Sequence, residues 1–268
     1  MTFVRIAGVP HNVDVTGSGP VCVLSAGLGL GWFDWDPVVP LLAPHRTVVR
    51  FDRPGLGLSG HARVAPTLRG EAERILRVLD GVGLGGEKAT VVGHSLAGFH
   101  AEAFARLYPG RTAGLVLVDS SVEERPRVRV PRAARVRGTR ACGAVLCAAG
   151  VPRALGPTLR RRAAPTRWAG VYGTGRVLRA ALMEYVTYGD AAVELAALRE
   201  AGPLPGGAPV IVLAAYAGGS KKWLGRQREL ASGLGGEFRV ARPSGHLVMR
   251  DRPGDVAEAV LAGGGGGG

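Results

Sequence analysis

The segment 93–98, Gly-His-Ser-Leu-Ala-Gly, constrains this 268-residue chain more than any other feature. It lies between an apolar run at 89–92 and a stretch at 99–108 that predicts a helix. Small residues stand two positions before and two positions after Ser95, where bulky side chains would collide if the backbone turned sharply from strand to helix. Such a turn exposes the serine hydroxyl, so the sequence predicts Ser95 as a nucleophile.

The rest of the chain alternates between strand and helix patterns. Apolar runs predict strands at 3–7, 12–15, 21–26, 47–52, 89–92, 114–119, 209–214 and 238–241. Helical spacing predicts helices at 68–82, 99–108, 222–232 and 254–262. Continuous apolar strands that alternate with helices indicate an α/β fold, in which a largely parallel sheet is covered on both faces.

One long segment, 122–205, interrupts this alternation. It is rich in Arg, Ala and Pro, with helical stretches around 142–149 and 177–198. We therefore expect a core formed by 1–121 and 206–262, an inserted helical lid at 122–205, and a flexible glycine tail at 263–268 without a function.

A serine hydroxyl needs a base to remove its proton and backbone N–H groups to stabilise the oxyanion that forms. His246 is the predicted base, because it lies on a short loop between a strand and the last predicted helix. The predicted oxyanion hole consists of the N–H groups of Leu96 and Leu28. Leu96 follows the nucleophile, and Leu28 lies in the glycine loop after the 21–26 strand.

Four motifs together resemble the α/β-hydrolase-fold family: the glycine loop 26–29, the segment 51–59 (Phe-Asp-Arg-Pro-Gly-Leu-Gly-Leu-Ser), the elbow 93–98, and Ser-Gly-His at 244–246. The resemblance covers nearly the whole chain. It implies a mostly parallel eight-stranded sheet whose second strand runs antiparallel, with a helical lid inserted after the sixth strand. In this family Asp52 and Arg53 organise the loop that shapes the pocket.

The chain departs from the family pattern at two places. The family usually has His-Gly where this chain has Ala26-Gly27, although a backbone donor survives that change. The family most often places the acid of the triad after the seventh strand, but residues 215–222 contain no carboxylate. Some members carry the acid after the sixth strand, where this chain has Asp119, with Glu123 and Glu124 just beyond. Asp119 is the predicted acid, with turn capping as its alternative role.

The formal net charge is +13, and residues 125–179 hold 14 Arg and no Asp or Glu. Most of this charge is expected to be a solvated basic face, with weak contact to an anionic membrane or an acidic partner as the alternative. No nucleic-acid-binding, metal or cofactor motif accompanies it, and the sequence does not indicate the oligomeric state. Three scattered cysteines and no signal peptide or membrane-spanning run predict a cytoplasmic protein with reduced thiols.

These patterns predict a serine hydrolase of the esterase or thioesterase type, acting on a small-molecule acyl substrate without a cofactor. Trp32, Phe33 and Trp35 follow the glycine loop and are expected either to line an acyl pocket or to be buried under the lid. One alternative is a non-hydrolytic tailoring enzyme, a lyase or cyclase, on the same fold. Another is a non-catalytic protein that binds a ligand or a membrane surface.

Overall fold

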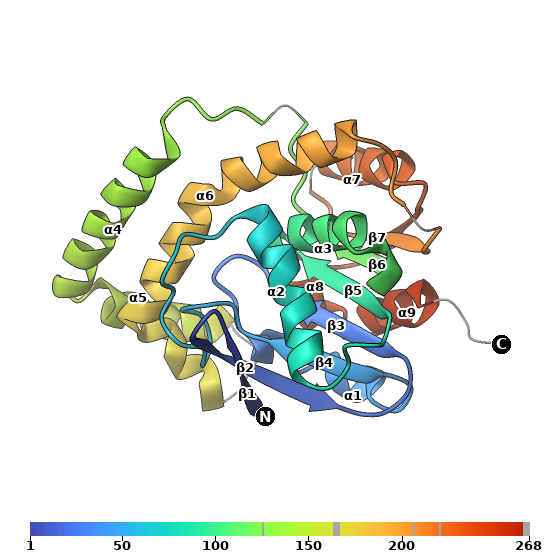
Figure 1. The fold of residues 1–268 in the computed structure, drawn as a ribbon, viewed down its shortest axis with the longest axis horizontal. Coiled ribbons are helices and arrows are strands. Elements are labelled where there is room, and N and C mark those ends of the chain that lie inside the picture. The colour runs from blue at the N-terminus through green and yellow to red at the C-terminus, as the bar shows by residue number, and fades with distance from the viewer. Residues whose placement is uncertain (125, 163–166, 206, 220, 265–268) are drawn as a thin grey trace.

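A twisted eight-stranded sheet forms the centre of the molecule, in the order β1-β2-β4-β3-β5-β6-β7-β8 (Figure 1). The computed structural model describes residues 1–124, 126–162, 167–205, 207–219 and 221–264. The strands are β1 Thr2–Ile6, β2 Val9–Thr16, β3 Val21–Ser25, β4 Thr47–Phe51, β5 Ala89–His94, β6 Thr112–Val118, β7 Val210–Ala215 and β8 Glu237–Ala241. Strand β2 is antiparallel to both of its neighbours, and β3 to β8 are parallel to one another. The predicted sheet is confirmed.

Helices cover both faces of this sheet. Helices α2 Leu68–Gly81, α3 Leu96–Leu107 and α7 Lys221–Gly233 pack their apolar side chains on one face. Helices α1 Val39–Leu42, α8 Val248–Asp251 and α9 Pro253–Gly263 pack on the other. The central strands β3 and β5 to β7 are buried almost throughout, which explains why they read as continuous apolar runs.

The segment between β6 and β7 is helical and lies over the carboxyl edge of the sheet (Figure 1). It contains α4 Arg132–Ala148, α5 Val151–Arg162, a 3₁₀ segment at Arg167–Gly173 and the long helix α6 Gly175–Glu200. Helix α4 begins well before the predicted stretch, and α5 was not predicted. Only one residue of α4, Gly143, is buried, so α4 lacks the broad apolar stripe by which helices are found in a sequence.

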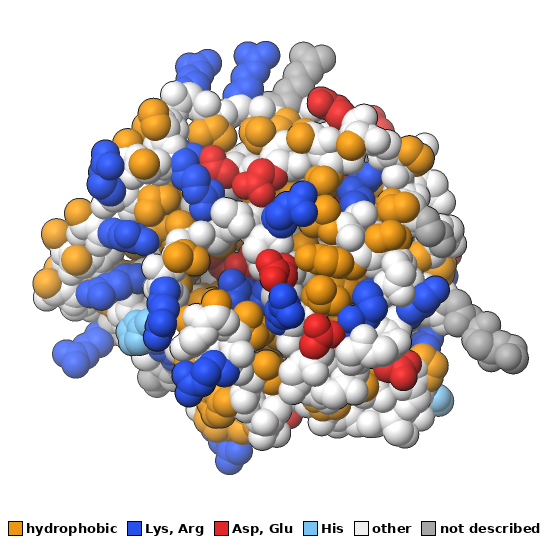
Figure 2. All heavy atoms as spheres, viewed as in Figure 1, with side chains coloured by type: hydrophobic (Ala, Val, Ile, Leu, Met, Phe, Trp, Pro, Cys, Tyr) orange, Lys and Arg blue, Asp and Glu red, His pale blue; other side chains and the backbone are white. Residues whose placement is uncertain are grey.

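Basic side chains gather on the outer surface of this segment, over α4 at the left of Figure 2. Of the 14 arginines, Arg125 and the side chains of 160–162 lie outside the described residues. No helix in the described ranges is both long and apolar enough to cross a bilayer.

The first two glycines of the C-terminal run, Gly263 and Gly264, contact the rest of the protein. Gly263 is the last residue of α9, and a side chain there would meet Val116 of β6. The carbonyl of Gly264 accepts a hydrogen bond from Arg46 at 3.0 Å. The expected flexible tail therefore does not include these two glycines, and residues 265–268 lie outside the described part of the chain.

Candidate active site

Ser95 lies at a sharp turn between β5 and α3. Its backbone has φ 53° and ψ −124°, a combination that non-glycine residues rarely adopt. A Cβ atom at Gly93 would lie 2.2 Å from the carbonyl oxygen of Ala97, so the turn excludes larger residues at position 93. The local pattern of small residues thus has a direct steric cause, and it leaves the Ser95 side chain half-buried at the sheet edge.

His246 lies beside Ser95 on the loop that follows β8. Its Nε2 is 3.0 Å from the Ser95 Oγ, and its Nδ1 is 2.6 Å from Oδ2 of Asp119. A carboxylate can only accept a hydrogen bond, so Nδ1 carries the proton and Nε2 is free to accept from the serine hydroxyl. The structure brings these three predicted residues together in one continuous chain of hydrogen bonds.

Asp119 follows β6 directly and is buried, with positive φ of 40°. Its second oxygen, Oδ1, accepts from the backbone N–H of Ala215 at 3.0 Å and from the indole N–H of Trp223 at 2.7 Å. These two donors bind Oδ1, while Oδ2 is directed at His246. No pattern in the sequence pointed to Trp223, which lies in α7, far along the chain.

The two other candidate carboxylates contact different groups. Glu123 accepts a hydrogen bond from the Tyr188 hydroxyl at 3.2 Å, and Glu124 forms an ion pair with Arg226 at 2.7 Å. Asp119 is therefore the one of the three that the structure joins to the imidazole by a hydrogen bond.

His94, the residue before Ser95, holds the His246 loop. Its Nε2–H donates to the carbonyl of His246 at 2.8 Å, and the two rings lie 4.7 Å apart. Burial, and then the nearby His246 ring, lower the pKa of His94 to about 3, so this imidazole is neutral at pH 7. A neutral neighbour does not oppose charge on His246 as a cation would.

The two predicted oxyanion donors lie close to Ser95. The Leu96 N–H opens α3 and has no intrahelical acceptor, because the first N–H groups of any helix lack one. The loop 26–30 passes so near that a Cβ at Gly27 would lie 3.2 Å from the Ser95 Cβ. Within the described residues, no backbone acceptor faces the Leu28 N–H. Both N–H groups are thus available to a negatively charged oxygen near Ser95.

The aromatic residues Trp32, Phe33 and Trp35 are buried. Trp35 packs in the core on the α9 face, whereas Trp32 and Phe33 pack with Ala169, Tyr172 and the start of α6. Of the two roles left open for them, burial is the one seen here. Among the described residues that line the cavity beside His246, none is one of these three aromatics, although Phe33 packs against Tyr172, which does line it.

An apolar cavity of about 440 Å³ opens beside His246. It lies between the loop after β3, the segment 122–205 and the start of α8. Apolar side chains supply most of its wall, namely Leu28, Leu30, Pro152, Leu155, Val177, Leu178, Ala181 and Leu247. A molecule in this cavity would lie against Leu28 and against His246, whose Nε2 is 3.0 Å from the Ser95 hydroxyl oxygen.

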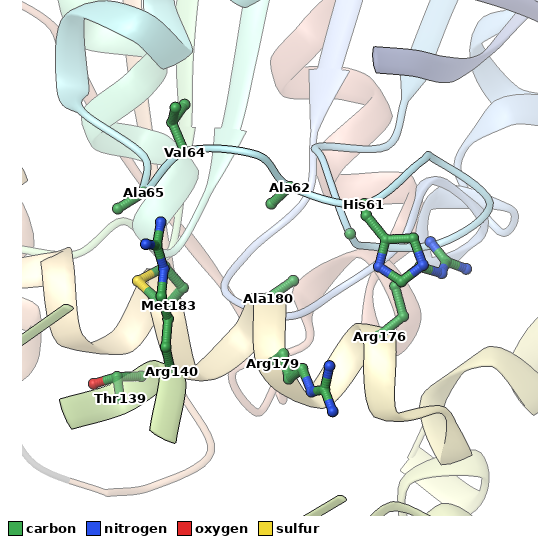
Figure 3. A pocket seen from close by; sticks show the side chains of 11 residues that line it. His61, Ala62, Val64, Ala65, Thr139, Arg140, Arg176, Arg179, Ala180 and Met183 are labelled. Carbon is green, nitrogen blue, oxygen red and sulfur yellow. The ribbon is translucent and has the colours of Figure 1, made fainter. Parts of the chain in front are cut away.

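A second cavity, of about 220 Å³, lies on another side of α6 (Figure 3). Arg140 of α4, Arg176 and Arg179 of α6 and His61 of the loop after β4 contribute to its wall. Arg176 donates to the carbonyls of Leu56, Ser59 and Gly57, which ties α6 to that loop. In Figure 3 the guanidinium groups of Arg140 and Arg179 point in different directions. Contact with an anionic membrane or acidic partner stays a prediction.

Comparison with known proteins identifies related sequences. A model of the alpha/beta hydrolase family matches residues 22–259. The chain is 33% identical to "Putative carbamate hydrolase RutD" of Azorhizobium caulinodans over 106 residues. The matched segment covers 40% of this chain and 39% of that protein. The chain is 36% identical over 137 residues, 48% of each chain, to the protein of the same name from Caulobacter vibrioides. The matches therefore span less than half the length of these curated relatives.

Solved structures share the whole architecture. Cfl2 from Burkholderia cenocepacia superposes with a TM-score of 0.75 at 24% identity, over 97% of this chain and 94% of that one. The enol-lactonase from Burkholderia xenovorans LB400 superposes with a TM-score of 0.69 at 21% identity, over 97% and 98%. These similarities show the fold.

Proposed function

The chain belongs to the alpha/beta hydrolase family, and from that premise we propose that it is a serine hydrolase that cleaves an ester, thioester or related acyl bond. The observation that carries the proposal is the hydrogen-bond chain from Asp119 through His246 to Ser95, with distances of 2.6 and 3.0 Å. This arrangement of a hydroxyl, an imidazole and a carboxylate is the one that activates a serine.

The reaction follows from the positions of these groups. As Ser95 Oγ forms a bond to the substrate carbonyl carbon, His246 Nε2 takes the hydroxyl proton and Asp119 stabilises the resulting imidazolium. His246 then returns the proton to the leaving group as the bond between that group and the carbonyl carbon breaks. A water molecule, deprotonated by His246, releases the acyl group from Ser95 by the same steps. The Leu28 and Leu96 N–H groups stabilise the oxyanion in both halves.

The wall of the cavity beside His246 supports an uncharged, apolar acyl or alkoxy group as the substrate part bound there. Burial of apolar surface against leucine, valine and alanine side chains stabilises such a group, whereas a charged group would lose its hydration without a partner. The names of the curated relatives support the broader acyl class. A carbamate also has a carbonyl carbon that a serine can attack.

A polar side chain in the cavity tests this part of the proposal. In Leu178→Asn, kcat/KM for p-nitrophenyl octanoate is expected to fall by about tenfold, because the acyl chain would bury an unpaired amide. The value for p-nitrophenyl acetate should hardly change, since the short acyl group does not reach Leu178. Val193→Asn is the matched control, because Val193 is exposed on the same helix. Equal losses for both esters would contradict the assignment of the cavity to the acyl chain.

A fluorophosphonate probe tests the proposed chemistry directly. The probe is expected to label the wild-type protein at Ser95 with one equivalent bound, and ester hydrolysis should disappear in parallel, because only an activated serine attacks phosphorus rapidly. Peptide mapping by mass spectrometry identifies the labelled residue. A wild-type protein that is neither labelled nor active on any ester would contradict the proposal and favour a lyase, a cyclase or a binding protein.

A further inference from the structure

A buried ion pair lies where the long helix α6 meets the glycine loop 26–30. Arg53, after β4, is 4% exposed and Glu184, in α6, is 7% exposed. Arg53 Nε lies 2.6 Å from Oε1 of Glu184, and a second guanidinium nitrogen lies 3.1 Å from Oε2. Burial favours the neutral form of Arg53, but the attraction of Glu184 outweighs it and the pKa of Arg53 stands above its usual value. The Arg53 guanidinium therefore keeps its charge although it is buried.

Among the described residues, the other side-chain hydrogen bonds of this pair go to the glycine loop. Arg53 donates to the carbonyl of Ala26 and, at 2.7 Å, to the carbonyl of Gly27. Glu184 accepts from the backbone N–H of Gly29 at 2.9 Å. A buried ion pair is costly to form unless its hydrogen bonds are all made. Here the partners that complete it are the backbone groups on either side of Leu28.

The bond to Gly27 has a direct consequence for Leu28. The Gly27 carbonyl and the Leu28 N–H belong to one planar trans peptide unit, in which C=O and N–H point in opposite directions. When Arg53 holds the carbonyl on its side, the N–H must face the other way. That N–H has no backbone acceptor within the described residues, and its loop lies against Ser95.

We propose that the Arg53–Glu184 pair is a positioning device, which holds the Gly27–Leu28 peptide in the orientation that completes the oxyanion hole at Ser95. This inference rests on the proposed function. Gly27 and Gly29 give the loop little stiffness of its own, and Gly29 has a φ of +71°. The Gly27 carbonyl also accepts from the Leu30 N–H at 3.1 Å, but that donor belongs to the same flexible loop. Without the pair this one local bond is left to hold the peptide, which can then rotate and turn its carbonyl oxygen towards the developing negative charge. Helix α6 thereby contributes to catalysis through the loop, although Glu184 itself does not touch the reacting atoms.

The substitution Glu184→Gln tests the inference, since it removes the charge with little change in shape. One oxyanion donor is worth about 10²- to 10³-fold in kcat, so a partly misoriented peptide is expected to lower kcat by about 10- to 100-fold. KM for a p-nitrophenyl ester should change little, because the donor acts mainly on the transition state. The inhibition constant of an alkylboronic acid, which forms a tetrahedral anion on the serine, should rise by the same factor as kcat falls.

The matched control is Glu102→Gln. Glu102 is 1% exposed and pairs with Arg106 at 2.9 Å and with Arg199 of α6 at 2.5 Å, so its loss also breaks a buried ion pair to α6. Its hydrogen bonds go to α6 and α3 rather than to the glycine loop. We expect Glu102→Gln to lower the melting temperature as much as Glu184→Gln does, but to keep wild-type kcat and boronate affinity.

Glu184→Gln leaves the buried Arg53 charge without a partner, which can destabilise the fold. A second variant allows the inference to be tested in that case. The double substitution Arg53→Met and Glu184→Leu removes both charges, and exchanges of this kind often preserve stability. The same loss of kcat and boronate affinity is expected. If either variant folds and has the kcat and boronate affinity of the wild type, the inference is wrong and the pair is structural only. An inactive wild-type protein would instead overturn the proposed function, and this inference with it.

Discussion

Replacing Ser95 with alanine is expected to lower kcat/KM for a p-nitrophenyl ester by about 10⁴- to 10⁶-fold, the range seen when a serine nucleophile is removed. The variant has no hydroxyl to attack the carbonyl carbon, so neither the acyl-enzyme nor its hydrolysis can occur. The residual rate comes only from the oxyanion donors and from binding. Steady-state kinetics measures the loss, and circular dichroism with a thermal melt checks the fold.

Ser25→Ala is the control for this substitution. Ser25 is a buried serine at the same edge of the sheet, paired in register with Gly93, and its hydroxyl has no partner in the described part of the chain. Its loss should leave kcat/KM within about threefold of wild type, as for a change that removes no catalytic group. Full turnover by Ser95→Ala would show that another residue is the nucleophile.

Replacing Asp119 with asparagine is expected to lower kcat by about 10⁴-fold while the fold is kept. An asparagine amide can donate to Nδ1 of His246, which holds the imidazole in the tautomer with its proton on Nε2. That tautomer has no lone pair with which to accept the serine proton. Steady-state kinetics measures the effect, and circular dichroism checks the fold.

Two further substitutions separate Asp119 from the neighbouring carboxylates. Glu123→Gln and Glu124→Gln should retain nearly full activity, because these side chains bond to Tyr188 and Arg226 rather than to His246. Trp223→Phe removes one donor to Asp119 and should lower kcat by about 10- to 100-fold, as expected for the net value of one hydrogen bond to a charged group. If Glu123→Gln or Glu124→Gln were inactive while Asp119→Asn was active, the assigned acid would be wrong.

The elements that could be predicted are those whose signal is local. The strands of the central sheet read as apolar runs because both of their faces are covered, and the turn at Ser95 requires small residues within a few positions of the serine. Helices α4 and α5 could be predicted only in part. The exposed, arginine-rich surface of α4 carries no broad apolar stripe, and the fold rather than the local sequence places both helices over the sheet edge.

The residues of the candidate site also fall into two groups, those that the local sequence indicates and those that only long-range contacts identify. Ser95 and His246 could be chosen from their loops, but three carboxylates followed β6 at similar distances along the chain. Asp119 differs from the others through its contacts with His246, Ala215 and Trp223, which lie about one hundred or more residues further on. No spacing rule connects such residues, because their distance depends on how β6, β7 and α7 pack together.

By itself, the sequence determined the class of fold, the turn that presents Ser95 and the loop that carries His246, because each depends on backbone geometry within a few residues. Only the tertiary structure decided which carboxylate meets the imidazole and which groups orient the glycine loop. The Arg53–Glu184 pair joins residues 131 positions apart, and His94 reaches a carbonyl 152 positions away. Contacts of this kind arise when distant segments are buried together, where each polar group must find a partner that the local sequence does not specify.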